Sequence, residues 1–239
     1  MTILSVTDLD VRYGQFRAVR GVSLDVAKGE VVALIGANGA GKTTLLRALA
    51  GANRIHAGSV HLNGTDITRS PSHARVVAGL ALVPEGRKLF LDMTVTENLM
   101  LGRTAGRPGD WTVDRVFDTF PNLVKRRHAA TGTMSGGEQQ ATAIGRALMS
   151  NPDVLILDEV SLGLSPLVVD QVYASLDSLL KTGTTIILVE QDLSRAMAVA
   201  DRVVCMLEGR VQLDSPMAAT SRTAITQAYF GIMPQGEPA

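Results

Sequence analysis

The sequence contains one cysteine, few aromatic residues and no excess of either charge. The single thiol, Cys205, cannot form an internal disulfide, which fits a reducing compartment, and its apolar neighbours at 203–207 predict a small buried residue. Lysine plus arginine and aspartate plus glutamate both number 23, so the formal net charge is zero. Because nucleic-acid binding usually requires a basic excess, we expect no nucleic-acid partner.

The chain also lacks a long apolar run. No window approaches the roughly 18 to 20 apolar residues that a membrane-spanning helix requires. Residues 1–14 alternate between polar and apolar types, with no basic region before an apolar stretch, so we expect no signal peptide. Any role at a membrane would therefore go through a partner. With 239 residues and 46% hydrophobic content, the chain can bury a sizeable core, in one domain or in a domain with an inserted lobe.

The most informative stretch is GANGAGKTT at 36–44, which follows the apolar run VVALI. It matches the phosphate-binding pattern G-x-x-x-x-G-K-[ST] at every fixed position, and a helix is predicted to follow it. Glycine lets the backbone approach an anion closely, Lys42 can reach the β and γ phosphates, and the Thr43 hydroxyl can help hold Mg²⁺. A glycine-rich turn without a ligand is the disfavoured alternative. The predicted nucleotide contacts are Gly36, Asn38, Gly39, Ala40, Gly41, Lys42, Thr43 and Thr44.

The surrounding patterns predict a mixed α/β protein. Alternating residues at 4–11 and 21–26 predict antiparallel strands, and short apolar runs predict further strands at 58–63, 80–83, 154–157, 185–189, 202–207 and 210–213. A hairpin turn at Glu208–Gly209 is predicted to join the last two. Apolar residues at helical spacing between 95 and 128 predict a mainly helical lobe. Its basic run at 125–128 is interpreted as a solvated helix end. The tail that contains Pro234, Gly236 and Pro238 is expected to fray.

Three further candidates each have an ordinary structural alternative. Tyr13 ends a predicted strand, where covering a hairpin and stacking on a base are equally favoured. Glu85 follows the strand at 80–83, and taken alone it is better explained as a solvated carboxylate than as a metal ligand. The residues Ser135, Gly136 and Gly137 open a helix, where they could bind phosphate, but a plain N-cap is the favoured account of so short a signal.

Two adjacent carboxylates, Asp158 and Glu159, follow the apolar strand VLIL. Neighbouring side chains at a strand end point in different directions, so the two groups can take different roles. In a chain that already carries a phosphate loop, we assign Asp158 to Mg²⁺ and Glu159 to an attacking water.

Four segments together resemble a known family. The phosphate loop, MSGGEQQ at 134–140, VLILDE at 154–159 and SLGLSP at 161–166 stand in the order found in nucleotide-binding subunits of ABC transporters. The resemblance covers about residues 3–231. Within that family, VPEGRKLF at 83–90, TVTENLMLG at 94–102 and LVEQD at 188–192 resemble the LivF-type ATPases of branched-chain amino-acid importers.

The resemblance implies a fold and an activity. The fold would be an α/β P-loop NTPase core with an antiparallel β-lobe and an inserted α-helical lobe. It would form a single domain, residues 1–239, with its core at 1–84 and 151–239 and its helical lobe at about 85–150. The activity would be ATP hydrolysis that powers amino-acid import, with ATP and Mg²⁺ bound.

The same resemblance implies a role for each site residue. Tyr13 would stack on adenine, and the signature residues 135–137 would cover the γ-phosphate of ATP held by the opposite subunit of a head-to-tail dimer. Lys42, Glu159 and Gln191 would be catalytic. The metal ligands would be Thr43, Glu85 and Asp158.

The resemblance also implies partners. They are transmembrane permease subunits, a second, non-identical ABC ATPase subunit or a second copy of this chain, and indirectly a periplasmic or extracellular solute-binding protein. The chain would then act at the cytoplasmic face of the inner or plasma membrane. An importer ATPase for urea, amides or another small solute is an alternative. So is a soluble ABC switch protein, which usually carries two cassettes or a long coiled-coil insertion.

Three residues depart from the general ABC pattern. Glu85 replaces a glutamine, and its charge would tighten metal binding. Gln191 replaces a histidine; a carboxamide can donate to the γ-phosphate but cannot become cationic at neutral pH. Both substitutions fit the branched-chain subgroup, and Gln191 suggests that a different subunit supplies the histidine. Val160 replaces a proline and is expected to loosen its turn slightly.

Overall fold

A computed structural model describes residues 1–232 and divides the chain into two compact units. The first unit comprises residues 1–69 together with the chain from Ile187 onward, and the second comprises residues 70–186. The boundary falls within strand β8 (Thr185–Val189), whose five residues are all buried. The predicted frayed tail lies outside the described residues.

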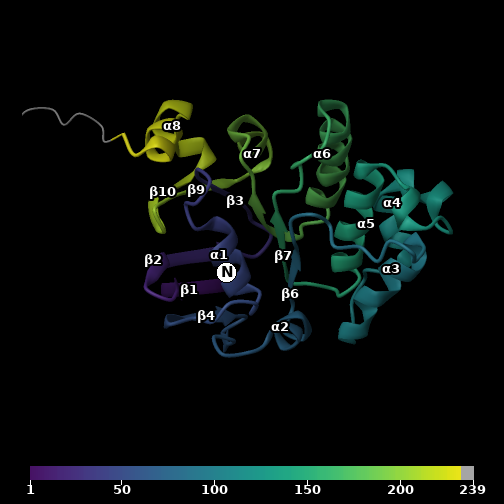
Figure 1. Cartoon of the computed structure of the whole chain (residues 1–239), viewed down its shortest axis with the longest axis horizontal. Helices are drawn as coiled ribbons and strands as arrows, with labels where there is room; N and C mark the ends of the chain where they lie inside the picture. Colours follow the sequence, from purple (N-terminus) through teal and green to yellow (C-terminus); the bar gives the residue numbers. More distant parts are fainter. Residues whose placement is uncertain (233–239) are drawn as a thin grey trace, which may run out of the picture. The chain divides into compact units, whose positions relative to one another are not determined.

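The first unit contains a four-stranded antiparallel sheet in the order β2-β1-β4-β5 (Figure 1). β1 (Thr2–Tyr13) and β2 (Phe16–Ala27) are each longer than the predicted strands. Alternate residues of β2 are buried, which is the pattern of a sheet with one face on a core. The turn Asn63–Gly64 joins β4 (Ala57–Leu62) to β5 (Thr65–Asp66), and both turn residues have positive φ, as a two-residue hairpin requires.

The same unit carries the strand that leads into the phosphate loop. β3 (Val31–Ile35) is fully buried and pairs in parallel with β9 (Arg202–Leu207), which turns back into antiparallel β10 (Arg210–Pro216). Apolar residues of β3 and β9 form a core with Ala196 of α7 (Leu193–Val199) and Ile225 of α8 (Arg222–Phe230). Cys205 belongs to this core and is fully buried, as predicted.

The second unit combines a parallel strand pair with the predicted helical lobe. β6 (Leu80–Val83) follows α2 (Ser72–Ala78) and pairs in parallel with β7 (Val154–Asp158). Figure 1 shows α3 (Val95–Gly102), α4 (Val113–Thr119) and α5 (Gly136–Leu148) gathered together in teal. The short helices η1 (Arg103–Ala105), η2 (Pro121–Arg126) and η3 (Thr131–Thr133) connect them. The helices predicted between 95 and 128 are therefore confirmed.

The basic run at 125–128 ends a 3₁₀ helix instead of an α-helix. Arg126 from this run forms an ion pair with Glu138 of α5, at 3.1 Å between Nε and Oε1. Its charge therefore has a partner within the second unit. Three helices had no counterpart in the sequence-based prediction: α6 (Pro166–Leu180), α7 and α8. No helix in residues 1–232 is long and apolar enough to cross a membrane.

Candidate nucleotide site

The phosphate loop joins β3 to α1 (Lys42–Leu49) in the predicted strand, loop and helix order. Its glycines are needed for two different reasons. An ideal Cβ on Gly36 would lie 2.3 Å from the Met206 carbonyl oxygen, and one on Gly41 would lie 2.4 Å from the Ala18 carbonyl oxygen. Gly39 has open space around it but a φ of +83°, which L side chains rarely adopt. The loop backbone therefore carries no side chain at these three positions, where an anion would approach.

Lys42 is buried inside this loop, with 4% of its surface exposed. Its ammonium donates to the carbonyl oxygens of Gly36 and Ala37, at 2.6 and 3.1 Å. The cation is thus fixed among the backbone groups that would surround a phosphate. Of the remaining loop residues, Asn38 and Gly39 are exposed and Ala40 is buried, while Thr43 and Thr44 on the first turn of α1 are half-buried.

The β9–β10 turn supports the phosphate loop through two backbone hydrogen bonds, which we call the brace. The sequence predicted the turn but not these bonds. The Gly209 amide donates to the Ala40 carbonyl at 2.9 Å, and the Arg20 amide donates to the Gly209 carbonyl at 2.8 Å. Glu208 and Gly209 both have positive φ, as expected for a tight hairpin. A Cβ on Gly209 would lie 2.7 Å from the Ala18 carbonyl oxygen, so this position also requires glycine.

Cys205 lies on β9 opposite Ile35, the last residue before the loop. Burial raises the pKa of its thiol to about 11, although the charge of Lys42 acts in the opposite direction. The thiol therefore stays protonated and inert at neutral pH, as a structural core residue would.

Tyr13 and Gln191 belong to the same unit as the loop. The Tyr13 side chain is half exposed, and its hydroxyl accepts a hydrogen bond from Asn53 Nδ2 at 2.7 Å. A half-exposed ring with an anchored hydroxyl suits base stacking, and this role of Tyr13 stays a prediction. Gln191 is exposed directly after β8, beside buried Glu190. Asp192 then caps α7 by accepting from the Ser194 and Arg195 amides.

The adjacent carboxylates of the second unit differ in environment, in keeping with the proposed division of roles. Asp158 is the last residue of β7 and is 3% exposed, whereas Glu159 is half-buried. Glu159 has a φ of +48°, a left-handed conformation that costs a non-glycine residue roughly 1–2 kcal/mol. Val160, which stands where the general ABC pattern has proline, is 1% exposed. Its buried apolar side chain anchors the turn.

Glu85 follows β6 and is exposed at the start of an irregular loop. Three consecutive residues after it have positive φ: Gly86 at 75°, Arg87 at 63° and Lys88 at 47°. Such a run is strained for the two non-glycine residues and needs support from its surroundings. Helix α5 supplies this support, because Gln139 Oε1 accepts a hydrogen bond from Arg87 Nη1 at 3.2 Å.

The signature residues open α5 through a capping box. Ser135 Oγ accepts from the Glu138 amide, while the Glu138 carboxylate accepts from the Ser135 amide and hydroxyl, both at 2.9 Å. Burial raises the pKa of Glu138, but these bonds and Arg126 outweigh it and the net pKa is lowered. The favoured N-cap account of Ser135 is therefore confirmed as its local role.

The two signature glycines serve close packing. A Cβ on Gly136 would lie 2.5 Å from Leu164 Cδ2, and one on Gly137 would lie 2.9 Å from Val168 Cγ1. The segment SLGLSP and the start of α6 therefore press against the N-terminal end of α5. Gly136 and Gly137 carry no side chains, so neither residue covers the backbone at this helix end.

Each unit carries donors of the chemistry that a magnesium nucleotide requires. The bare loop and the enclosed Lys42 ammonium suit phosphate oxygens, and the Thr43 hydroxyl and Asp158 carboxylate are hard oxygen donors of the kind that Mg²⁺ prefers. Within residues 1–232, no group of three or more histidine, cysteine, aspartate or glutamate side chains could hold a metal ion. Few protein ligands are typical for Mg²⁺, which takes most of its oxygens from phosphates and water.

Comparison with known proteins places the chain in a family. A family model described as "ABC transporter" matches residues 19–161. The branched-chain amino acid transport ATP-binding protein BraG of Pseudomonas aeruginosa is 42% identical over 232 residues, which cover 96% of this chain and 100% of BraG. A probable branched-chain amino acid transport ATP-binding protein, LivF of Archaeoglobus fulgidus, is 34% identical, over 87% of this chain and 90% of LivF.

Solved structures agree with the fold. A nucleotide-free ATP-binding cassette from an ABC transporter superposes with a TM-score of 0.83 at 25% identity, and covers 96% of this chain and 99% of its own. The ADP conformation of an ATP-binding cassette of an ABC transporter gives the same TM-score at 26% identity, with 97% and 99% covered. The predicted P-loop fold is confirmed, and the chain belongs to the ABC transporter family as an ATP-binding cassette ATPase.

Proposed function

We propose that this chain binds and hydrolyses Mg·ATP as one ATPase subunit of an importer for branched-chain or related amino acids. The observation that carries the ATPase part is the loop itself, where glycine is required at Gly36 and Gly41 and the Lys42 ammonium is held inside. The two relatives described above, which are named for branched-chain amino acid transport, support the choice of solute.

The proposed chemistry gives each residue a defined task. Lys42 binds the β and γ phosphates, and the Gln191 amide donates to the γ-phosphate. Thr43, Asp158 and Glu85 would hold Mg²⁺, which neutralises charge on the phosphates when bound. Glu159 orients the water that attacks the γ-phosphorus, whereupon the bond to the bridging oxygen breaks and ADP and inorganic phosphate leave. Tyr13 stacks on the adenine.

The proposal includes an assembly. The chain forms one cassette, with its core at 1–84 and 151–239 and its helical lobe at about 85–150. Ser135, Gly136 and Gly137 of one subunit cover the ATP held by a second ATPase subunit in a head-to-tail dimer. The dimer attaches to permease subunits at the cytoplasmic face of the membrane, and a solute-binding protein delivers the amino acid.

The substitution Glu159→Gln tests the proposal. It keeps the shape of the side chain and removes the charge that orients water, so we expect hydrolysis by the purified protein to fall by about 10²–10⁴-fold, with ATP binding retained. In cells that express Glu159→Gln in place of the natural chain, uptake of labelled leucine should be lost.

The matched control is Asp118→Asn, which removes an exposed carboxylate on α4 and should change neither measurement. Hydrolysis unaffected by Glu159→Gln would refute the catalytic assignment. Loss of urea or amide uptake, with leucine uptake intact, would refute the branched-chain assignment and leave the ATPase standing.

A further inference from the structure

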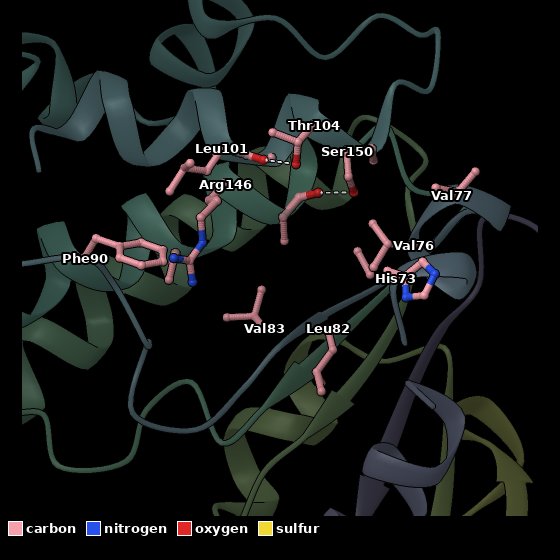
Figure 2. A pocket seen from close by; sticks show the side chains of 15 residues that line it. His73, Val76, Val77, Leu82, Val83, Phe90, Leu101, Thr104, Arg146 and Ser150 are labelled. Carbon is pink, nitrogen blue, oxygen red and sulfur yellow. Dashed lines mark hydrogen bonds between the residues drawn. The ribbon is translucent and has the colours of Figure 1, made fainter. Parts of the chain in front are cut away.

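The hydroxyl of Tyr13 is bonded to a segment of the chain far from its own strand. Asn53 Nδ2 donates to this hydroxyl at 2.7 Å, across 40 positions of sequence. Many hydroxyls bond within their own helical turn instead. Thr104 and Ser150, beside the apolar pocket of the second unit, each donate at 2.7 Å to a carbonyl three residues earlier (Figure 2). Bonds of that kind hold a single turn, whereas the Asn53 bond joins two distant segments of the first unit.

The segment that carries Asn53, residues 51–56, leads from α1 into β4 and is bonded to the end of β1 at further points. The His56 amide donates to the Asp10 carbonyl at 2.8 Å. The Arg12 amide donates to His56 Nδ1 at 3.2 Å. Together with the bond between Asn53 and Tyr13, these contacts fix the segment alongside residues 10–13.

The same segment is bonded to the last turn of α1. The amides of Ala52 and Asn53 both donate to the Arg47 carbonyl, at 2.8 and 3.1 Å. Helix α1 begins at Lys42, inside the phosphate loop. One helix and one side-chain hydrogen bond therefore connect the phosphate loop to the Tyr13 ring, and the position of the ring relative to the loop depends on Asn53.

The turn after β1 gives the Tyr13 ring little support of its own. The ring is 51% exposed, and the next three residues, Gly14, Gln15 and Phe16, are exposed as well. An ideal Cβ on Gly14 would have no neighbour within 4 Å. A ring that is already held in one orientation loses less conformational freedom when a ligand stacks on it, so a bond to its hydroxyl strengthens binding.

We propose that Asn53 is a positioning residue for the nucleotide, which holds the Tyr13 ring in the orientation that stacks on the adenine of ATP. The inference rests on the proposed function, because it deepens the role given there to Tyr13. Asn53 acts through the Tyr13 hydroxyl, so it contributes to recognition of the base and not of the phosphates.

Isothermal titration with two probes tests this division. Mg·AMP-PNP, a hydrolysis-resistant analogue of ATP, carries both base and phosphates, whereas magnesium tripolyphosphate lacks the base. Asn53→Ala and Tyr13→Phe each remove one partner of the bond and keep the aromatic ring. We expect each variant to bind Mg·AMP-PNP about fivefold more weakly, as the loss of one neutral hydrogen bond predicts. The affinity for tripolyphosphate should not change.

A double variant and a kinetic measurement separate positioning from a general structural effect. Asn53→Ala combined with Tyr13→Phe should bind no more weakly than either single variant, because both changes remove the same bond. In steady-state hydrolysis, Asn53→Ala should raise KM for ATP by about fivefold and leave kcat unchanged. Asn122→Ala, the same change at an exposed asparagine of η2, is the matched control and should alter neither constant.

The outcomes separate the inference from the proposed function. Unchanged Mg·AMP-PNP affinity in Asn53→Ala overturns the inference and leaves the ATPase in place. Equal losses of Mg·AMP-PNP and tripolyphosphate affinity also overturn it, because Asn53 would then support the phosphate loop. Additive losses in the double variant would mean that Asn53 does not act through the Tyr13 hydroxyl. Binding of neither probe by the natural chain overturns the proposed function itself.

Discussion

The glycines of the phosphate loop are constrained by packing at some positions and by backbone conformation at others. At Gly41 a Cβ would meet the Ala18 carbonyl oxygen at 2.4 Å, and backbone atoms cannot move aside as a flexible side chain could. At Gly39 the surroundings are open, and only the positive φ disfavours a side chain. Two neighbouring glycines in one motif should therefore respond differently to the same substitution.

We expect Gly41→Ala to abolish ATP binding, because the loop must shift away from Ala18 and take Lys42 with it. Gly39→Ala is the matched control: it should destabilise the loop by roughly 1–2 kcal/mol through the left-handed conformation alone and weaken binding by about thirtyfold at most. Isothermal titration with ATP measures both. Equal losses in the two variants would mean that backbone strain, and not contact with the Ala18 carbonyl, governs the loop.

Local patterns predicted most of the candidate site, and contacts between distant residues account for what they missed. The phosphate loop and the Asp158–Glu159 strand end are contiguous motifs, so their spacing alone identified them. Gly209 was recognised only as a turn residue, because its bond to Ala40 depends on the pairing of β9 with β3.

At the scale of elements, two helices of the second unit begin with the same capping box. Thr94 and Glu97 open α3, as Ser135 and Glu138 open α5, and both pairs satisfy backbone amides at the helix start. In each case the hydrogen bonds lower the pKa of the glutamate, although burial opposes this at Glu138. Both caps should therefore weaken as pH falls and the glutamates become protonated.

A comparison of the two caps separates the capping role of Ser135 from its proposed role in contacting ATP. Ser135→Ala and Thr94→Ala should each cost about 1 kcal/mol of unfolding free energy, measured by urea denaturation. Only Ser135→Ala should also reduce ATP hydrolysis, because only Ser135 is proposed to contact ATP held by the opposite subunit. Equal hydrolysis in the two variants at saturating ATP would leave Ser135 with its capping role alone.

Elements were easier to predict where their apolar pattern was simple. The buried strands β3, β7 and β8 are continuous apolar runs, and their bounds were predicted to within a residue. α6 was missed although it is a 15-residue helix, because no element was predicted between 167 and 184. Runs of four or five apolar residues are shorter than a typical helix, and this length is what favours a strand for them.

At the scale of the whole molecule, we hypothesise that Gln191 determines whether one kind of subunit is enough for turnover. A glutamine can donate to a γ-phosphate but cannot hold a proton there, so a chain acting alone would hydrolyse ATP slowly. The residue is exposed after β8 and followed by the cap of α7, so a change of side chain can be accommodated.

We expect Gln191→His to raise the hydrolysis rate of the purified chain by at least about tenfold, as a gained acid–base group can. Adding a second, histidine-bearing ATPase subunit to the natural chain should have a similar effect. Gln212→His, an exposed change on β10, is the control and should have none. Brisk hydrolysis by the natural chain alone, abolished by Glu159→Gln, would show that no second kind of subunit is required.

The brace on the phosphate loop has a consequence for how the protein is made. The Val31 amide at the start of β3 donates to the Asp201 carboxylate, 170 residues further along the chain, and Gly209 bonds Ala40 in the loop itself. During synthesis the loop sequence emerges early, but the residues that hold its shape emerge near the end. A chain terminated before Asp201 would lack both bonds, so we expect it to carry the motif but to bind ATP more weakly than the full-length chain.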